Sequence, residues 1–160
     1  MTEPELPKKD LFGEILRDRA AGEIRIVRDA SAARPWLRWL ARLLLRREAR
    51  ALAAVSDIDG VPRLLVAERD LLARSYLPGV PMQQGKPRDP AYFAAAARLL
   101  RSLHRAGVVH NDLAKEPNLL VRDDGTPAFV DFQLAEYAPG RGGLFRRLGY
   151  DVLISLQQLS

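Results

Sequence analysis

Three polar side chains in the second half of the chain have types and a spacing that suit metal binding. They are Asp112, Asn118 and Asp131. Carboxylate and amide oxygens are hard ligands, and Mg²⁺ is usually held by one or two carboxylates, with waters or substrate oxygens completing its shell. We therefore expect a magnesium site wherever the fold brings these three residues together.

A predicted β-hairpin supplies the reason for them to meet. Two apolar runs, Leu119 to Val121 and Ala128 to Val130, are joined by a segment that contains Asp124-Gly125. Asp-Gly between apolar runs is a strong hairpin signal, because glycine accepts the positive φ that the turn demands. A hairpin brings its two ends together, so Asn118 and Asp131 should converge.

This constellation resembles the catalytic loop and the metal loop of the protein-kinase-like superfamily. Asp112 lies in a His-Asn-Asp-Leu segment at 110–113, where that superfamily has His-Arg-Asp-Leu. Asn118 corresponds to the loop asparagine, and Asp131 begins an Asp-Phe-Gln triplet in place of Asp-Phe-Gly. The thirteen-residue step between them is also the family spacing. The resemblance covers roughly residues 11 to 155.

Within the superfamily, the sequence is more similar to an atypical branch. Gln133 follows Asp-Phe, an apolar residue replaces the usual catalytic-loop lysine, and a Tyr-Leu-Pro-Gly segment stands at 76–79. These features resemble RIO kinases, aminoglycoside phosphotransferases and lipopolysaccharide core kinases.

The resemblance implies phosphoryl transfer from ATP and a role for each loop residue. Asp112 would orient the acceptor hydroxyl and accept its proton, while Asn118 and Asp131 would hold Mg²⁺ on the nucleotide phosphates. Lys115 could reach the transferred phosphate. His110 would have a structural role, bonding to the loop backbone and to Asp131. Asp112 and Asn118 are six residues apart, where most of the superfamily has five.

The largest departure is the cation that normally pairs with the nucleotide phosphates. No lysine lies in the expected strand, because the four in the chain are Lys8, Lys9, Lys86 and Lys115. Arg28 is the nearest substitute, and Glu48 is the only acid on the helix whose glutamate would pair with it. Arginine keeps the charge but is a planar fork, not a compact ammonium. A Gly-rich loop is also missing.

The Tyr-Leu-Pro-Gly segment has two structural interpretations. Taken by itself, it is an ordinary turn. Its place between a strand pair and the next helix favours the hinge that presents backbone groups to adenine in the resembled families, with Tyr76 and Leu77 lining that slot.

The remaining pattern predicts the elements that position these groups. Ser31 is the expected N-cap of a long helix over 31–55, and Asp89 and Gly107 should bound a helix that runs to about Arg105. Strands are expected at 11–16, 23–28, 61–67 and 71–76, a polar linker at 82–88, an irregular segment at 136–143 and a final helix at 145–160 that carries Asp151.

These elements predict an α+β fold, and the resemblance implies that they are arranged as the two lobes of a protein kinase. Residues 1–10 form a flexible arm and residues 11–79 a small β-rich N-lobe that includes the long helix. Residues 80–160 form a shortened, mainly helical C-lobe with a catalytic loop at 108–118 and a metal loop at 131–133.

Composition limits the partners. The 160 residues carry a net charge of +5, with a pI near 10.0, which favours anionic partners such as a nucleotide or an anionic membrane surface. Nucleic acid is a weaker interpretation, since it explains the arginines but not the Asp/Asn/Asp set. The absence of cysteine fits a reducing cytoplasm.

The long helix over 31–55 has a second use. It combines two tryptophans with an arginine every fourth residue, which is typical of helices that lie on anionic membranes. Packing of its apolar face against the lobe is the more ordinary interpretation. Peripheral contact would suit an enzyme working on lipopolysaccharide at the inner face of the membrane.

The sequence therefore leaves two main hypotheses for the function and a weaker third one. The first is an ATP- and Mg²⁺-dependent phosphotransferase whose acceptor is a protein Ser/Thr or a sugar hydroxyl. The second is a pseudokinase that binds nucleotide or acts as a scaffold without turnover, favoured by the missing lysine and Gly-rich loop. A purely basic interaction protein is a third, weaker possibility.

Overall fold

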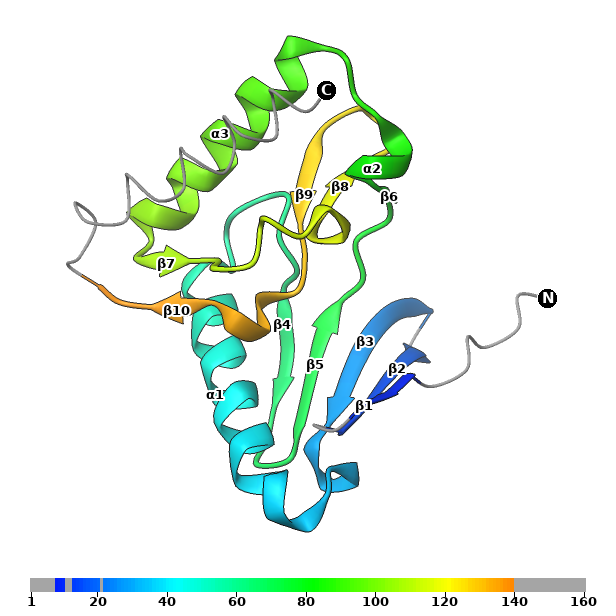
Figure 1. Ribbon diagram of the computed structural model, residues 1–160, viewed down its shortest axis with the longest axis vertical. Helices are drawn as coiled ribbons and strands as arrows, with labels where there is room; N and C mark the ends of the chain where they lie inside the picture. The colour runs from blue at the N-terminus through cyan, green and yellow to red at the C-terminus, as the bar shows by residue number, and fades with distance from the viewer. Residues whose placement is uncertain (1–7, 11–12, 21, 140–160) are drawn as a thin grey trace.

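The computed structural model describes residues 8–10, 13–20 and 22–139, and its first half contains an antiparallel five-stranded sheet (Figure 1). The strand order is β1-β2-β3-β5-β4. Its strands are β1 (Lys8–Asp10), β2 (Gly13–Ala20), β3 (Glu23–Asp29), β4 (Leu64–Ala67) and β5 (Leu71–Ser75).

Two predictions for this half need correction. The last three residues of the predicted flexible arm form β1 and pair with β2, because Asp10 lies opposite Gly13 across a short connection. The strand predicted from Val61 begins only at Leu64, since Pro62 has no N–H to donate to a sheet ladder. Residues 1–7 lie outside the described part of the chain.

The long helix also begins later than predicted. Ser31 lies in a 3₁₀ turn, and α1 (Arg38–Ala54) starts seven residues further on, with no side-chain cap at Leu37. Pro35 is the cause: its ring excludes the preceding residue from the helical region, and Arg34 accordingly has a ψ of 138°. No helix among the described residues is both long and apolar enough to cross a membrane.

The second half consists of short strands around one long helix. Its elements are β6 (Val80–Pro81), α2 (Met82–Gly85), α3 (Pro90–Arg105), β7 (Val108–Val109), β8 (Leu119–Val121), β9 (Pro127–Phe129) and β10 (Glu136–Tyr137). They form a three-stranded sheet in the order β6-β8-β9 and a two-stranded sheet of β10 with β7.

The α3 boundaries agree with the prediction. The Asp89 side chain accepts a 2.8 Å hydrogen bond from the Ala91 N–H, and Gly107 follows the helix with a φ of 78°. The prediction of a polar linker at 82–88 is wrong for the first part of that range. Met82 is buried, and the single turn of α2 packs against β8.

The predicted hairpin is confirmed, with its second strand shifted by one residue. Leu119 pairs with Phe129 and Val121 with Pro127, and the Val130 N–H donates to the Asn118 carbonyl at 2.9 Å. The two ends of the hairpin therefore meet, which places Asn118 beside the residue that precedes Asp131.

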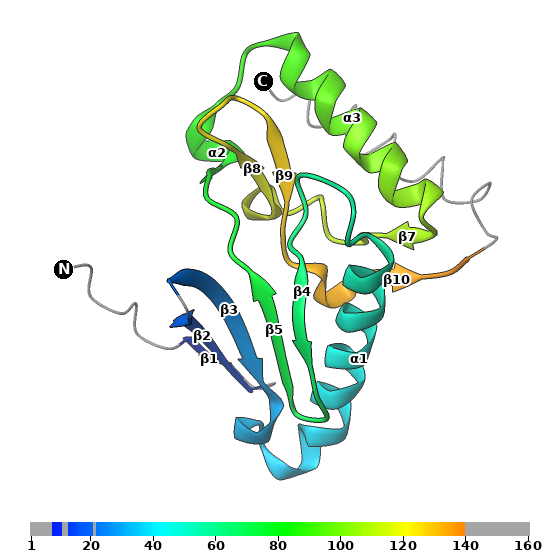
Figure 2. The ribbon, with the colours of Figure 1, turned by 180° about the vertical axis from the view of Figure 1, so that it is seen from behind.

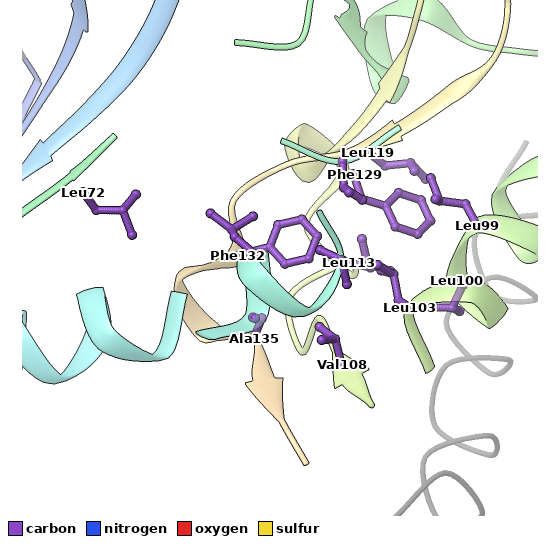
Figure 3. Packing of buried hydrophobic residues seen from close by; sticks show 14 of the residues in the cluster. Leu72, Leu99, Leu100, Leu103, Val108, Leu113, Leu119, Phe129, Phe132 and Ala135 are labelled. Atoms are coloured by element: carbon purple, nitrogen blue, oxygen red, sulfur yellow. The ribbon is translucent and has the colours of Figure 1, made fainter. Parts of the chain in front are cut away.

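One hydrophobic cluster joins the two halves (Figure 3). Leu119 and Phe129 of the hairpin pack with Leu103 of α3, and Phe132 lies against α1. Seen from behind, α1 runs beside β4 and ends near β10, and the helix contacts both the sheet and the segment after the hairpin (Figure 2). The described fold is α+β, as predicted. The final helix expected at 145–160 lies outside the described residues, as do residues 140–143 of the irregular segment.

Gly60 ties the end of the first half to the hairpin, and its replacement should be costly. Its φ is +89°, and an added Cβ would lie 3.0 Å from Leu99 Cδ2 and 3.1 Å from the Pro127 carbonyl oxygen. We expect Gly60→Ala to lose about 1–2 kcal/mol of unfolding free energy from the left-handed backbone, plus about 1–3 kcal/mol from crowding, measured by urea denaturation.

Gly125→Ala is the matched control. Gly125 has a similar φ of +77° but open space around its missing Cβ, so this variant should show the backbone cost alone. Equal losses in the two variants would contradict the crowding at Gly60.

Candidate active site

The residues of the predicted catalytic loop form a small hydrogen-bonded unit. The Asn118 Nδ2 donates to both the Asp112 carbonyl and Asp112 Oδ2, each at 2.9 Å. Lys115 Nζ lies 3.1 Å from the same Oδ2, with two-thirds of its side chain exposed. These donors fix the orientation of the Asp112 carboxylate and leave its Oδ1 for another partner.

The unusual six-residue spacing is absorbed without opening the loop. The Lys115 N–H donates to the Asp112 carbonyl and the Asn118 N–H to the Lys115 carbonyl, and residues 116–118 form a 3₁₀ turn. Two successive tight turns thus take up the extra residue, and Asn118 still returns to Asp112.

His110 has a buried, bracing position. Its Nε2 donates to the Val130 carbonyl at 2.8 Å, and its ring lies edge-on to Phe132 with 4.7 Å between centroids. Burial lowers the pKa of His110, so the ring is neutral near pH 7. The side chain is 1% exposed and holds the strand end before Asp131 without facing solvent. The sequence interpretation expected Asp131 itself as a bonding partner, and the bond is made to its neighbour Val130 instead.

Asp131 occupies a strained backbone position between the two halves. It is a non-glycine residue with a φ of 60°, and its carboxylate accepts weakly from the Gln133 N–H at 3.4 Å. The same Oδ1 accepts from Arg28 Nη2 at 2.8 Å. Strained residues of this kind persist only when their surroundings hold them, and they cluster at functional sites.

Arg28 connects Asp131 to a fully buried glutamate. Its Nε lies 3.4 Å from Glu48 Oε2, so the pair expected from the sequence is formed. The other Glu48 oxygen, Oε1, lies 3.3 Å from Nε of Arg74. Glu48 is thus shared by two guanidinium groups.

Arg74 is the residue that sequence reasoning missed. It lies on β5 and is 8% exposed, and burial lowers its pKa while Glu48 opposes that shift. Arg28 pairs with Leu72, and Arg74 pairs with Ile26 on the neighbouring strands, so both arginines point to the face that α1 covers. The available signal was a charged residue directly after the apolar run Leu71-Leu-Ala, within the strand expected at 71–76.

The oxygen set suits a magnesium–nucleotide complex better than a bare ion. With its Nδ2 bonded to Asp112, the Asn118 amide has its oxygen left to offer, and Asp131 offers a carboxylate that is 35% exposed. Over the described residues, no group of three or more His, Cys, Asp or Glu side chains is placed to hold a metal. Phosphate oxygens and water would complete the shell, as is usual for Mg²⁺.

The predicted hinge follows β5 directly. The Tyr76 N–H donates to the Ile24 carbonyl at 3.2 Å, and Tyr76 and Leu77 are both half-buried. The first backbone donor of the segment is therefore used by the sheet. Contact with adenine stays a prediction for this pair.

Glu48 should be the most stability-critical acid of the site. Glu48→Gln keeps the size of the side chain but leaves the buried guanidinium of Arg74 without a charged partner and that of Arg28 with Asp131 alone. We expect a loss of about 3–5 kcal/mol in unfolding free energy, the usual scale for breaking a buried pair, measured by urea denaturation.

Asp59→Asn provides the matched acid-to-amide control. Asp59 pairs with Arg122 at 3.0 Å, but its side chain is 89% exposed, so its loss should be close to experimental error. Comparable effects in the two variants would contradict the importance of burial at Glu48.

Comparison with known proteins gives matches at three levels. The model of the phosphotransferase enzyme family, APH, matches residues 40–139, more than half of the chain. Serine/threonine-protein kinases AfsK of Streptomyces griseus and Streptomyces coelicolor are each 36% identical over 110 residues. That alignment covers 60% of this chain but 13% of either relative, so the chain corresponds to a small part of their length.

Solved structures with the same fold include Rio2 kinase from Chaetomium thermophilum. Its crystal structure matches with a TM-score of 0.70 and 17% identity, over 93% of this chain and 54% of that one. A second structure, the Rio2 complex with ADP/Mg²⁺ and phosphoaspartate, matches with a TM-score of 0.67 and 17% identity, over 93% and 53% of the two chains. The fold is thus protein-kinase-like, and the chain belongs to the phosphotransferase enzyme family.

Proposed function

We propose that this chain transfers the γ-phosphate of ATP to an alcohol hydroxyl, with Mg²⁺ as the metal. The observation that carries the proposal is the convergence of Asp112, Asn118 and Asp131 at one end of the hairpin, with Asp131 linked to Glu48 through Arg28. When bound, Mg²⁺ would neutralise charge on the phosphate oxygens.

The chain's own groups supply orientation and the proton acceptor. Asp112 Oδ2 is held by Asn118 and Lys115, so Oδ1 can accept the proton of the acceptor hydroxyl. The hydroxyl oxygen bonds to the γ-phosphorus as the bond from that phosphorus to the β,γ-bridging oxygen breaks, and ADP leaves. Lys115 is exposed and beside Asp112, so its ammonium can approach the transferred group.

A protein serine or threonine is the acceptor that the similarities favour. The curated relatives carry the name serine/threonine-protein kinase. A sugar hydroxyl, including one of a lipopolysaccharide core, is the competing acceptor class, and a screen of both classes would separate them.

Asp112→Asn and Asp131→Ala test the proposal. We expect Asp112→Asn to lower kcat about 10²–10⁴-fold, the usual contribution of a general base, while stabilisation by ATP with Mg²⁺ is retained in a thermal-shift assay. Asp131→Ala should lose the Mg²⁺-dependent part of that stabilisation. Asp57→Asn, an exposed acid in the turn after α1, should leave both readouts unchanged.

The pseudokinase alternative makes a different forecast for the same variants. Nucleotide binding would depend on Asp131, but wild type and Asp112→Asn would show the same background of ADP release. That result would remove the proposed transfer and leave a nucleotide-binding module.

The outer face of α1 supports a second proposal, contact with an anionic membrane surface. Trp39 and Leu43 of α1 are 66% and 46% exposed, and Trp36, in the 3₁₀ turn just before the helix, is 65% exposed. Arg46 and Arg50 are exposed further along, and Glu48, the only acid of α1, is buried away from this face. Aromatic side chains flanked by arginines suit an anionic bilayer interface. This contact would place the protein at the inner, cytoplasmic face of a membrane.

Vesicle sedimentation tests this contact. We expect binding to phosphatidylglycerol vesicles, little binding to phosphatidylcholine, and weakening as salt rises, because screening reduces the charge attraction. A Trp36→Ala/Trp39→Ala double variant should lose binding. Leu65→Ala, which removes an exposed apolar side chain on β4, should not. Equal binding to both lipids would refute the charge-dependent contact.

A further inference from the structure

Two buried arginines share one buried carboxylate at the centre of the molecule. Each oxygen of Glu48 faces a different guanidinium, Arg74 at 3.3 Å and Arg28 at 3.4 Å. Asp131 binds the far nitrogen of Arg28 at 2.8 Å. The four formal charges therefore cancel in the ligand-free protein.

This balance changes when Asp131 serves another cation. The Asp131 oxygen that accepts from Arg28 belongs to the carboxylate proposed for the metal. A divalent cation bound there would compete with the guanidinium, so the Nη group of Arg28 would be left for a new anionic partner. A polyphosphate bound beside it would supply such a partner.

If Arg28 were the sole partner of Glu48, the Glu48 carboxylate would be left unpaired whenever Arg28 moved to another anion. Arg28 would be drawn between the phosphates and Glu48, and a buried carboxylate that loses its partner is strongly destabilising. Arg74 removes this conflict, since it faces the second Glu48 oxygen from the neighbouring strand. Among the described residues, Glu48 is the acid within ion-pair distance of Arg74.

The position of Arg74 argues against direct contact with a nucleotide. Its side chain is 9% exposed, and its place on β5 puts it on the face of the sheet that α1 covers. The Asp131 side chain, by contrast, is 35% exposed. Arg74 thus acts on the site through Glu48.

We propose that Arg74 is a positioning residue for polyphosphate binding: it holds Glu48 in place so that the guanidinium of Arg28 can bind the nucleotide phosphates once Asp131 takes the metal. The inference rests on the proposed function. It divides between two arginines the task that one strand lysine performs in the resembled kinases.

Arg74→Met tests the proposal with Mg²⁺–ATP as the probe. We expect the Kd and KM for Mg²⁺–ATP to rise about tenfold, on the order of one charge-assisted hydrogen bond, with kcat within about threefold of wild type. The same change in a Glu48→Gln background should alter Kd less than about twofold, because Arg74 acts through Glu48. A purely structural role would lower the active fraction without moving KM.

Three further variants keep the result interpretable. Arg42→Met removes an arginine of α1 that is paired with Asp70 away from the site, so its Kd should match wild type. Arg74→Lys keeps the charge and should stay within about threefold, whereas Arg74→Gln should repeat the tenfold rise if the methionine variant fails to fold. An unchanged Kd in Arg74→Gln, or equal effects with and without the Glu48 carboxylate, would overturn the proposal.

The outcomes separate this inference from the proposed transfer. Wild-type binding of Mg²⁺–ATP without turnover would remove the transfer and leave the Arg74 effect on Kd to decide the inference. Turnover that depends on Asp112, with no Arg74 effect on KM, would remove the inference alone. A wild-type chain that binds no Mg²⁺–ATP overturns both.

Discussion

The buried carboxylate of Glu48 is the constraint on which the site depends. A carboxylate with no exposure to water must be paired, and its two oxygens face Arg28 and Arg74 on adjacent strands. These pairs fix α1 against the sheet. Arg28 also donates a hydrogen bond to Asp131, which extends the same network to the segment after the hairpin. One ionic cluster therefore sets the relation between helix, sheet and candidate metal ligand.

The arginine in place of a strand lysine has a geometric consequence. Arg28 uses Nε toward Glu48 and Nη2 toward Asp131, so one planar fork spans two acids from different parts of the chain. A lysine offers a single nitrogen to both. Arginine at position 28 therefore takes part in a larger ionic network that includes Arg74, and it is more than a weaker replacement for a lysine–glutamate pair.

In the predicted catalytic loop, too, local hydrogen bonds fix the orientation of the candidate site groups. His110 and Asn118 are both buried, and they hold the Val130 carbonyl and the Asp112 carboxylate respectively. Phe132 fills the core between His110 and α1. The orientation of Asp112 and Asp131 thus depends on the hydrophobic cluster as much as on polar contacts.

The sequence by itself determined the local features: the hairpin through Asp124-Gly125, the Asp89 cap of α3, and the likeness of residues 110–133 to kinase loops. Each depends on residues close in sequence, where turn and cap chemistry is strong. It also predicted the Arg28–Glu48 pair, but only through the resemblance. The predicted start of α1 was wrong, because the effect of Pro35 on the backbone of Arg34 outweighs the capping signal of Ser31. Only the tertiary structure decided that Arg74 shares Glu48 and that Arg28 reaches Asp131, because strand register and helix packing bring together charges that the chain keeps far apart.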